Sequence, residues 1–326
     1  MKIIVTGSLG NISRPLVMQL VNQGHQVTVI SSSAARKAEI EQLGAQAAIG
    51  EVEDGIFLTK IFEGHDAAYC MMPPFNFFGK QNLDYQEQAF NISTNYVQAI
   101  QKAGIKKVIH LSSVGAKKPA GAGVLVFHYI AESVFKQLPP DVAVTHLRPG
   151  SFDYNLYAFM EMIKGKGFLE GVIGKLLYLK HYGLKGLLKG YSGIILSNYG
   201  ATDKIAWVSP IDIASAIAEE FNAQHKGKRI RYVASEELTC QEIAAVLGNA
   251  IGKPYLKWVL ISDVQMKDAF IKIGASEKIA IEFTEMNVAM HDGSLFQDYF
   301  KNRPALLGRV KIKDFAKEFA LKYKEQ

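Results

Sequence analysis

The chain has 326 residues, of which 48% are hydrophobic and 21% charged, and its net charge is +6. This length predicts a large core in two lobes, and the mild positive charge suits an anionic cofactor but is too small to indicate nucleic-acid binding. Cys70 and Cys240 lie far apart and outside any metal-ligand spacing, so we expect neither a disulfide framework nor a metal site. No apolar run is long enough to span a bilayer and no signal peptide fits, which predicts a cytoplasmic protein.

A glycine turn between a strand and a helix opens the chain. Ile3–Val5 is typical of a short buried strand, and the apolar spacing that follows predicts a helix. Gly7 allows a sharp turn, and Gly10 lets a pyrophosphate approach the backbone N–H groups at the helix start. An ordinary strand–helix turn is the alternative. The context favours a dinucleotide site formed by Gly7, Ser8, Leu9, Gly10, Asn11 and Ile12.

The second predicted strand, Gln26–Ile30, ends in Ser31, Ser32 and Ser33, with Arg36 shortly after. An acidic residue at this position would accept the ribose hydroxyls of NAD, and none is present. Hydroxyls and a cation would instead receive a 2′-phosphate, so we expect NADP(H) to be preferred over NAD(H). A serine-capped helix start with solvated basic residues is the alternative, and both interpretations can hold.

Two further strands are predicted at Ala45–Glu51 and Asp66–Met72. Glu51 would lie near the adenine, unless it only caps the next helix. Ligands bind outside the carboxyl ends of parallel strands, so Met71, Met72 and Pro73 should border the nicotinamide ribose. The aromatic loop Phe75–Gly79 forms either a pocket wall or packing beneath the sheet.

A long helix near Asp84–Ala103 precedes a fifth strand that ends in Ser112-Ser113, and a sixth strand, Val142–Arg148, follows the next helix. This alternation predicts an α/β fold with a doubly wound parallel sheet of the Rossmann type. We expect a dinucleotide-binding domain over residues 1–150. A second, smaller and mostly helical substrate lobe over 151–326 should interleave with sheet elements near 205–235.

Three segments resemble a known family: Thr6–Ile12, the strand with Ser112-Ser113, and Leu147–Phe152. They are similar to the atypical short-chain dehydrogenases, and most of all to the NmrA-like NAD(P)-binding proteins. Trp207–Ala214 resembles that family's return to the sheet, and Glu237–Pro254 its substrate lobe. The resemblance implies a bound dinucleotide that also contacts Pro149, Gly150, Ser151 and Phe152. It leaves the substrate open, since the family includes quinone reductases, dye reductases and redox-sensing regulators.

The catalytic residues of this superfamily are missing. Short-chain dehydrogenases that use a tyrosine–lysine pair place the tyrosine four residues before the lysine, and none of the 14 tyrosines here has that spacing. Alignment puts Val124 at the tyrosine position and His128 at the lysine position, and a valine cannot be a general acid. His128, one turn from Glu132, is expected to hold the nicotinamide ribose or to donate a proton, unless it is only packed at a helix–sheet boundary. Tyr129 and Ser113 are weaker acid candidates.

The segment from Tyr157 to Ser197 is apolar and punctuated by glycine and lysine. It predicts covering helices, a substrate lid, or a surface for a partner or a membrane. We expect an NADPH-dependent reductase that passes a hydride to a small apolar acceptor, such as a quinone or an activated double bond. A non-catalytic redox sensor that binds a regulatory protein is the main alternative, and an epimerase-like enzyme acting on a nucleotide sugar is a weaker one. The oligomeric state is left open.

Overall fold

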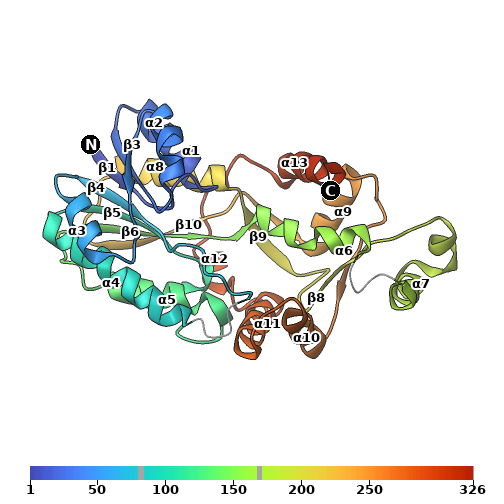
Figure 1. Ribbon diagram of the computed structural model, residues 1–326. Helices are drawn as coiled ribbons and strands as arrows, with labels where there is room; N and C mark the ends of the chain where they lie inside the picture. Colours follow the sequence, from blue (N-terminus) through green and yellow to red (C-terminus); the bar gives the residue numbers. More distant parts are fainter. Residues whose placement is uncertain (80–83, 167–170, 326) are drawn as a thin grey trace.

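Seven parallel strands form the central sheet of the protein (Figure 1). The computed structural model describes residues 1–79, 84–166 and 171–325. The strand order is β10-β6-β5-β4-β1-β2-β3. The strands span β1 (Lys2–Val5), β2 (Gln26–Ser31), β3 (Gln46–Ile49), β4 (Ala67–Cys70), β5 (Lys107–Leu111), β6 (Ala143–Pro149) and β10 (Lys228–Val233). The order reverses between β1 and β4, which is the switch point where doubly wound sheets bind ligands. The predicted fold class is confirmed.

Helices cover both faces of this sheet because successive residues of a strand point to opposite sides. Ile3 and Val5 of β1 face the core under α1 (Ser13–Asn22) and α8 (Pro210–Asn222), whereas Ile4 faces the opposite core. That second core lies under α3 (Gly55–Phe62), α4 (Tyr85–Ala103) and α5 (Val126–Phe135). The short α2 (Lys37–Gln42) follows β2.

The second lobe is mostly helical, as predicted, and it also carries two small sheets. One sheet is β11-β9-β7, from β7 (Ser151–Phe152), β9 (Lys204–Val208) and β11 (Glu236–Thr239); the other pairs β8 (Ile195–Ser197) with β12 (Trp258–Leu260). The segment expected to return to the main sheet pairs through β9 with the small sheet instead. It is β10 that rejoins the main sheet, parallel to β6.

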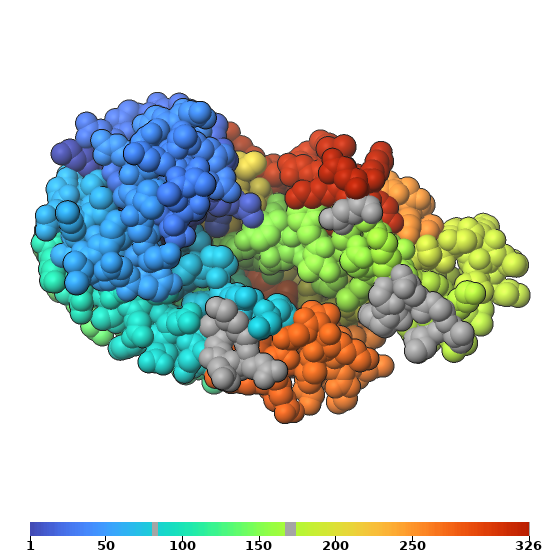
Figure 2. Space-filling model, viewed as in Figure 1, coloured from blue at the N-terminus to red at the C-terminus, as the bar shows by residue number. Residues whose placement is uncertain are grey.

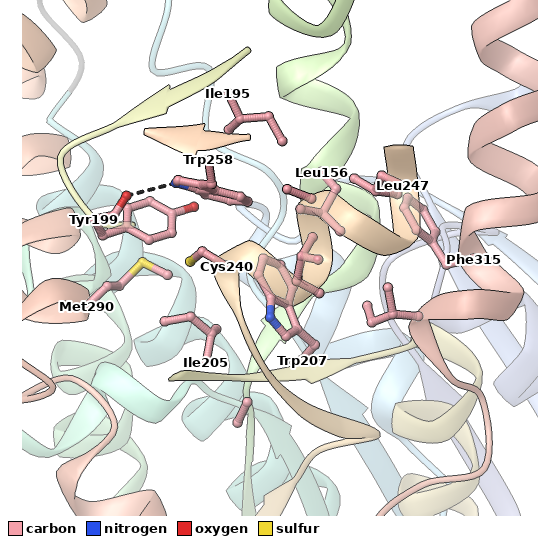
Figure 3. Packing of buried hydrophobic residues seen from close by; sticks show 14 of the residues in the cluster. Leu156, Ile195, Tyr199, Ile205, Trp207, Cys240, Leu247, Trp258, Met290 and Phe315 are labelled. Atoms are coloured by element: carbon pink, nitrogen blue, oxygen red, sulfur yellow. Dashed lines mark hydrogen bonds between the residues drawn. The ribbon is translucent and has the colours of Figure 1, made fainter. Parts of the chain in front are cut away.

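Most helices of the lobe contribute to a core that contains two tryptophans (Figure 3). Trp207 lies on β9, and Trp258 on β12 donates its indole N–H to the Tyr199 carbonyl at 2.9 Å. The helices are α6 (Met160–Lys164), α7 (Gly171–Leu188), α9 (Cys240–Ala250), α10 (Asp263–Lys272), α11 (Glu277–His291), α12 (Gln297–Lys301) and α13 (Ile312–Glu325). Of these, α7 and α10 contribute no described residue to that core. Short 3-10 turns, η1 (Ala34–Arg36), η2 (Val114–Lys117), η3 (Gly123–Leu125) and η4 (Asp153–Phe159), link several elements.

The aromatic loop after β4 joins the two parts of the molecule by packing. The Phe77 ring lies 5.2 Å from that of Tyr85 on α4 and 5.3 Å from that of Phe283 on α11. Phe78 stacks on the same Phe283 ring at 5.5 Å. Edge-to-face pairs of this kind add stability beyond their buried area. The packing interpretation of Phe75–Phe78 therefore holds, and the segment ties α4 to the lobe.

Candidate dinucleotide site

The opening turn joins the carboxyl ends of three strands. Gly7 has φ +88°, and a Cβ there would overlap the Met71 sulfur and the Ser13 hydroxyl. Ser13 donates to the Thr6 carbonyl at 2.8 Å, and the Thr6 hydroxyl accepts from the Met71 N–H at 3.0 Å. Ser8, at φ +54°, donates its N–H to the Ile30 carbonyl of β2 at 3.0 Å. Ser13 therefore fixes the start of α1 to the end of β1 through a hydrogen bond.

The start of α1 has the features of an anion site. Its N-cap residue, Ile12, makes no side-chain cap, and no acidic residue lies in its first turn. The Arg14 N–H donates to the Gly10 carbonyl at 3.0 Å and Pro15 has no N–H, so the N–H groups of Asn11, Ile12 and Ser13 are the ones left to hold an anion. Gly10 and Asn11 are exposed, whereas the side chains of Leu9 and Ile12 are buried in the core. Of the predicted contact residues, Leu9 and Ile12 can offer only their backbone.

The serines after β2 are divided between packing and solvent. Ser31 is buried, and its hydroxyl accepts from the Ser8 hydroxyl at 2.9 Å and from the Ser33 N–H at 3.2 Å. Ser32 and Ser33 are exposed. The predicted serine cap is not formed, since Ser33 at the N-cap of η1 makes no side-chain cap hydrogen bond, while Ser32 and Ser33 are open to a ligand.

Two arginines meet at this end of the turn. Arg36 lies 2.6 Å from a carboxylate oxygen of Glu39, and Arg14 in the first turn of α1 pairs with the other oxygen. Hydrogen bonds from Arg36 and then Arg14 lower the pKa of Glu39. Arg14 was missed by the sequence reasoning, because only the tertiary packing of α1 beside α2 brings it to Arg36. Arg14 and Arg36 are therefore two guanidinium groups that could bind the 2′-phosphate of NADP(H).

The other predicted contact residues lie at the carboxyl ends of β3, β4 and β6. Glu51 is exposed after β3, Met72 is buried, and Met71 and Pro73 are half-buried. Pro149 is buried, as is Gly150, where a Cβ would overlap the Ala206 carbonyl oxygen of β9. Gly150 is therefore explained by strand packing. Ser151 and Phe152 are half-buried in β7.

Tyr154 is a further residue at this edge that the sequence reasoning missed. Its ring lies 5.2 Å from that of Phe152, and its hydroxyl lies near the side chain of Asn11 in the opening turn. Burial raises the pKa of Tyr154 to about 12. No spacing rule links residue 154 to residue 11, so only the fold could show this proximity.

His128 is half-buried on α5, and its ring lies 4.0 Å from that of Phe127. Its Nδ1 atom is buried and has no hydrogen-bond partner among the described residues. Burial lowers the pKa of His128 to about 3; Glu132 opposes this shift and Arg148 adds to it. The imidazole is therefore neutral near pH 7, which disfavours proton donation by an imidazolium but leaves a hydrogen bond to a ligand open.

Glu132 does not orient His128, contrary to expectation. Its carboxylate accepts from Arg148 of β6 at 2.9 and 2.7 Å and from the Ser112 hydroxyl at 2.6 Å. Burial would raise the pKa of Glu132, but the hydrogen bonds and charge of Arg148 lower it below its ordinary value. Arg148 also donates to Tyr232 at 3.0 Å. Ser112 and Arg148, absent from the predicted site, thus fix α5 to the sheet just below the cofactor edge.

The residue that the resemblance aligns with the superfamily's tyrosine is buried. Val124 is 3% exposed in η3, which packs against α11. Gly123 beside it has φ +53°, and a Cβ there would overlap the Glu282 carbonyl oxygen of α11. Ser113 and Tyr129 are half-buried, and the Ser113 hydroxyl makes no hydrogen bond within the described ranges. Their proposed acid roles stay predictions.

A cavity of about 180 Å³ lies beyond Ser113, beside η2 and α12. Val114, Ala122 and Leu295 give it apolar walls, and Lys117 and Asp298 form an ion pair at its rim. In the part of the chain that the structure covers, no group of three His, Cys, Asp or Glu side chains could hold a metal ion. Within the same part, no helix combines the length and apolar character needed to cross a bilayer.

Comparison with known proteins adds the cofactor class. Residues 7–155 match the model of an NAD(P)H-binding domain family. The NAD(P)H azoreductase of Xenophilus azovorans is 21% identical over 285 residues, which cover 87% of this chain and 85% of the relative. The structure of an NADPH-dependent quinone oxidoreductase from Escherichia coli, solved with NADPH, superimposes with a TM-score of 0.71 at 18% identity, covering 97% of this chain and 99% of the other.

The triphenylmethane reductase of Citrobacter sp. has a TM-score of 0.70 at 17% identity, covering 99% of this chain and all of the other. These likenesses extend over both lobes, so the whole architecture is shared. With the seven-stranded parallel sheet, they support an atypical, extended NAD(P)-binding Rossmann architecture, in which residues 7–155 match the NAD(P)H-binding domain.

Proposed function

We propose that the protein is an NADPH-dependent reductase of a small apolar acceptor, such as a quinone or an activated double bond. The observation that carries this is the burial of Val124 under α11, since the resemblance aligns Val124 with the superfamily's acid and a valine cannot donate a proton. Met71, Met72 and Phe152 give the carboxyl ends of β4 and β6 an apolar character. An acceptor that delocalises the charge it gains needs no strong acid from the protein. The azoreductase, quinone oxidoreductase and dye reductase relatives support the same acceptor class.

The residues present fit a dinucleotide. When bound, NADPH would supply a hydride. The N–H groups at the start of α1 hold the pyrophosphate, and the exposed Ser32 and Ser33 face the ribose end. The Nδ1 of His128 is shielded from solvent and has no partner among the described residues, and a turn of the ring would let it meet a ligand hydroxyl; an unpaired buried polar atom costs about 1–3 kcal/mol. Tyr154 lies near Asn11 on the lobe side of the turn.

Preference for NADP(H) follows from Arg14 and Arg36. A 2′-phosphate carries more charge than a carboxylate and three acceptor oxygens, so it would replace Glu39 as their shared partner. Replacing Arg36 by alanine should weaken NADPH binding about tenfold, the worth of a charge-assisted hydrogen bond at a half-exposed site. NADH binding should not change. Lys37→Ala is the matched control, and fluorescence titration measures both cofactors; equal losses for NADPH and NADH would remove Arg36 from the phosphate site.

The activity is tested by following NADPH oxidation with a panel of quinones, azo dyes and enals. We expect turnover with at least one quinone or dye, and transfer of deuterium from C4-deuterated NADPH to the reduced product. His128→Leu should weaken NADPH binding, whereas His128→Asn, which keeps a polar atom, should retain more of it. Turnover that needs an added flavin would contradict direct transfer.

A redox sensor is the second candidate, favoured by the same burial of Val124. It predicts tight NADPH binding without turnover across the whole panel, and in that case the partner is a protein. An epimerase is disfavoured, because the alcohol oxidation it requires needs a base where Val124 stands.

A further inference from the structure

Helix α7 forms a projection at the end of the lobe farthest from the sheet (Figures 1 and 2). A break at Gly183, with φ 66° and ψ 176°, divides it into two helical pieces. Its outer side exposes four leucines: Leu176 is 61% exposed, Leu179 41%, Leu184 63% and Leu188 79%. This placement, away from the opening turn, argues against a lid over the cofactor.

The other side of α7 anchors the projection. Leu177, Tyr178, Tyr182 and Leu187 pack with Ile194 and Leu196 in a separate small core. The Tyr182 hydroxyl donates to the Gly193 carbonyl at 2.8 Å, and Lys257 donates to the His181 carbonyl at 2.7 Å. Since these inner contacts hold the helix, the outer leucines are not part of the core that supports α7.

Lysines flank the leucines on this outer side. Lys175, Lys180, Lys185 and Lys189 are all exposed, and residues 171–202 contain no aspartate or glutamate. At helical spacing, Leu176 and Leu179 lie between Lys175 and Lys180 on one arc. An apolar strip bordered by long basic side chains matches the lipid–water boundary, because lysines extend their charge to the headgroups while leucines enter the acyl region.

We propose that α7 docks the protein on an anionic lipid surface through Leu176, Leu179, Leu184 and Leu188. The charge decides between occupants: two copies meeting through this face would bring their lysines together with no acidic partner from residues 171–202. Anionic headgroups supply the missing negative charge. This goes beyond the proposed reductase and does not depend on it, since docking requires neither cofactor nor turnover.

Vesicle co-sedimentation of the full chain tests the proposal. We expect binding to mixed phosphatidylcholine–phosphatidylglycerol vesicles, weaker binding at high salt, and little binding to pure phosphatidylcholine. Leu184→Asp with Leu188→Asp should reduce partitioning at least about tenfold. Lys185→Gln with Lys189→Gln should reduce it about 25-fold, at roughly fivefold for each lysine.

Leu306→Asp and Leu321→Asp are matched controls, because those leucines are 88% and 63% exposed elsewhere on the molecule. All variants should bind NADPH like the parent protein, which shows that they are folded. Absence of vesicle binding by the parent, or equal loss with the control leucines, would overturn the proposal. So would a dimer in gel filtration that Leu184→Asp dissociates, since a second copy would then cover this face.

Discussion

The buried ion pair between Glu132 and Arg148 should be sensitive to a single substitution. Both side chains are nearly inaccessible, at 7% and 4%, and they share two hydrogen bonds. Replacing Glu132 by glutamine keeps the shape of the side chain but removes its charge. Arg148 would then remain buried, with a neutral amide in place of its closest carboxylate.

The expected loss is about 3 kcal/mol, the lower end of the range for breaking a buried pair. The lower end applies because Arg148 keeps the Tyr232 hydroxyl at 3.0 Å and Asp298 at 3.4 Å. At about 2.1 cal/mol/K of unfolding entropy per residue, a chain of 326 residues should lose about 4 °C in Tm. NADPH affinity should fall as well, since the pair fixes α5, which carries His128.

Urea denaturation followed by circular dichroism measures the free energy, and Asp141→Asn is the control. Asp141 pairs with Lys106 at 2.6 Å, but both side chains are more than 60% exposed, so its loss should leave the midpoint unchanged. The double substitution Glu132→Leu with Arg148→Met should recover most of the loss, because no charge is then left buried. If Glu132→Gln is no worse than Asp141→Asn, the reasoning from an uncompensated charge is refuted.

Two other predictions follow from buried groups. Gly150→Ala should lower the free energy of unfolding by about 3 kcal/mol or more, because the added Cβ would meet the rigid backbone of β9. Gly24→Ala is the control: Gly24 has φ +79° and open space around it, so the loss should be only about 1–2 kcal/mol of backbone strain. Equal losses in urea titrations would contradict this reasoning. The free energy of unfolding should fall as pH drops from about 6.5 towards 4. Burial lowers the pKa of His146 to about 4 and also lowers the pKa of His110. Over this range the unfolded chain therefore takes up protons that the folded chain does not. His146→Gln should reduce that slope by about 1.4 kcal/mol per pH unit, and an unchanged slope in thermal melts across this range would show that His146 does not stay neutral.

Local patterns were sufficient for the sheet, the caps and the opening turn. Two caps show this local control: Asp54 accepts from the N–H groups of Ile56 and Phe57, and Thr239 forms a capping box with Glu242. The long helix was placed within a residue of α4. Each of these features depends on residues a few positions apart, which is the range over which sequence spacing carries geometric information.

Pairings between distant elements were beyond that range. Glu132 lies one helical turn from His128, and this proximity suggested a pair, but a buried carboxylate is held by the strongest donor nearby, which is Arg148 on β6. In the same way, packing of elements that are distant in the sequence makes Arg14 and Arg36 share the Glu39 carboxylate. It also places Tyr154 near Asn11. Whether Val124 faced a cleft or a helix also depended on the docking of α11.

The sequence by itself thus determined the strand–turn–helix frame, with Gly7 and Gly10 in the turn after β1, because backbone sterics and hydrophobic periodicity act locally. Only the tertiary structure decided which residues pair with the buried charged side chains. A buried charge needs a partner because desolvation is costly, and the fold determines which partner lies within reach. It also decided that the glycine- and lysine-rich segment carries an outward helix, α7, with its leucines in solvent. Sequence spacing showed that this helix was amphipathic, but not which of its faces the rest of the protein would leave uncovered.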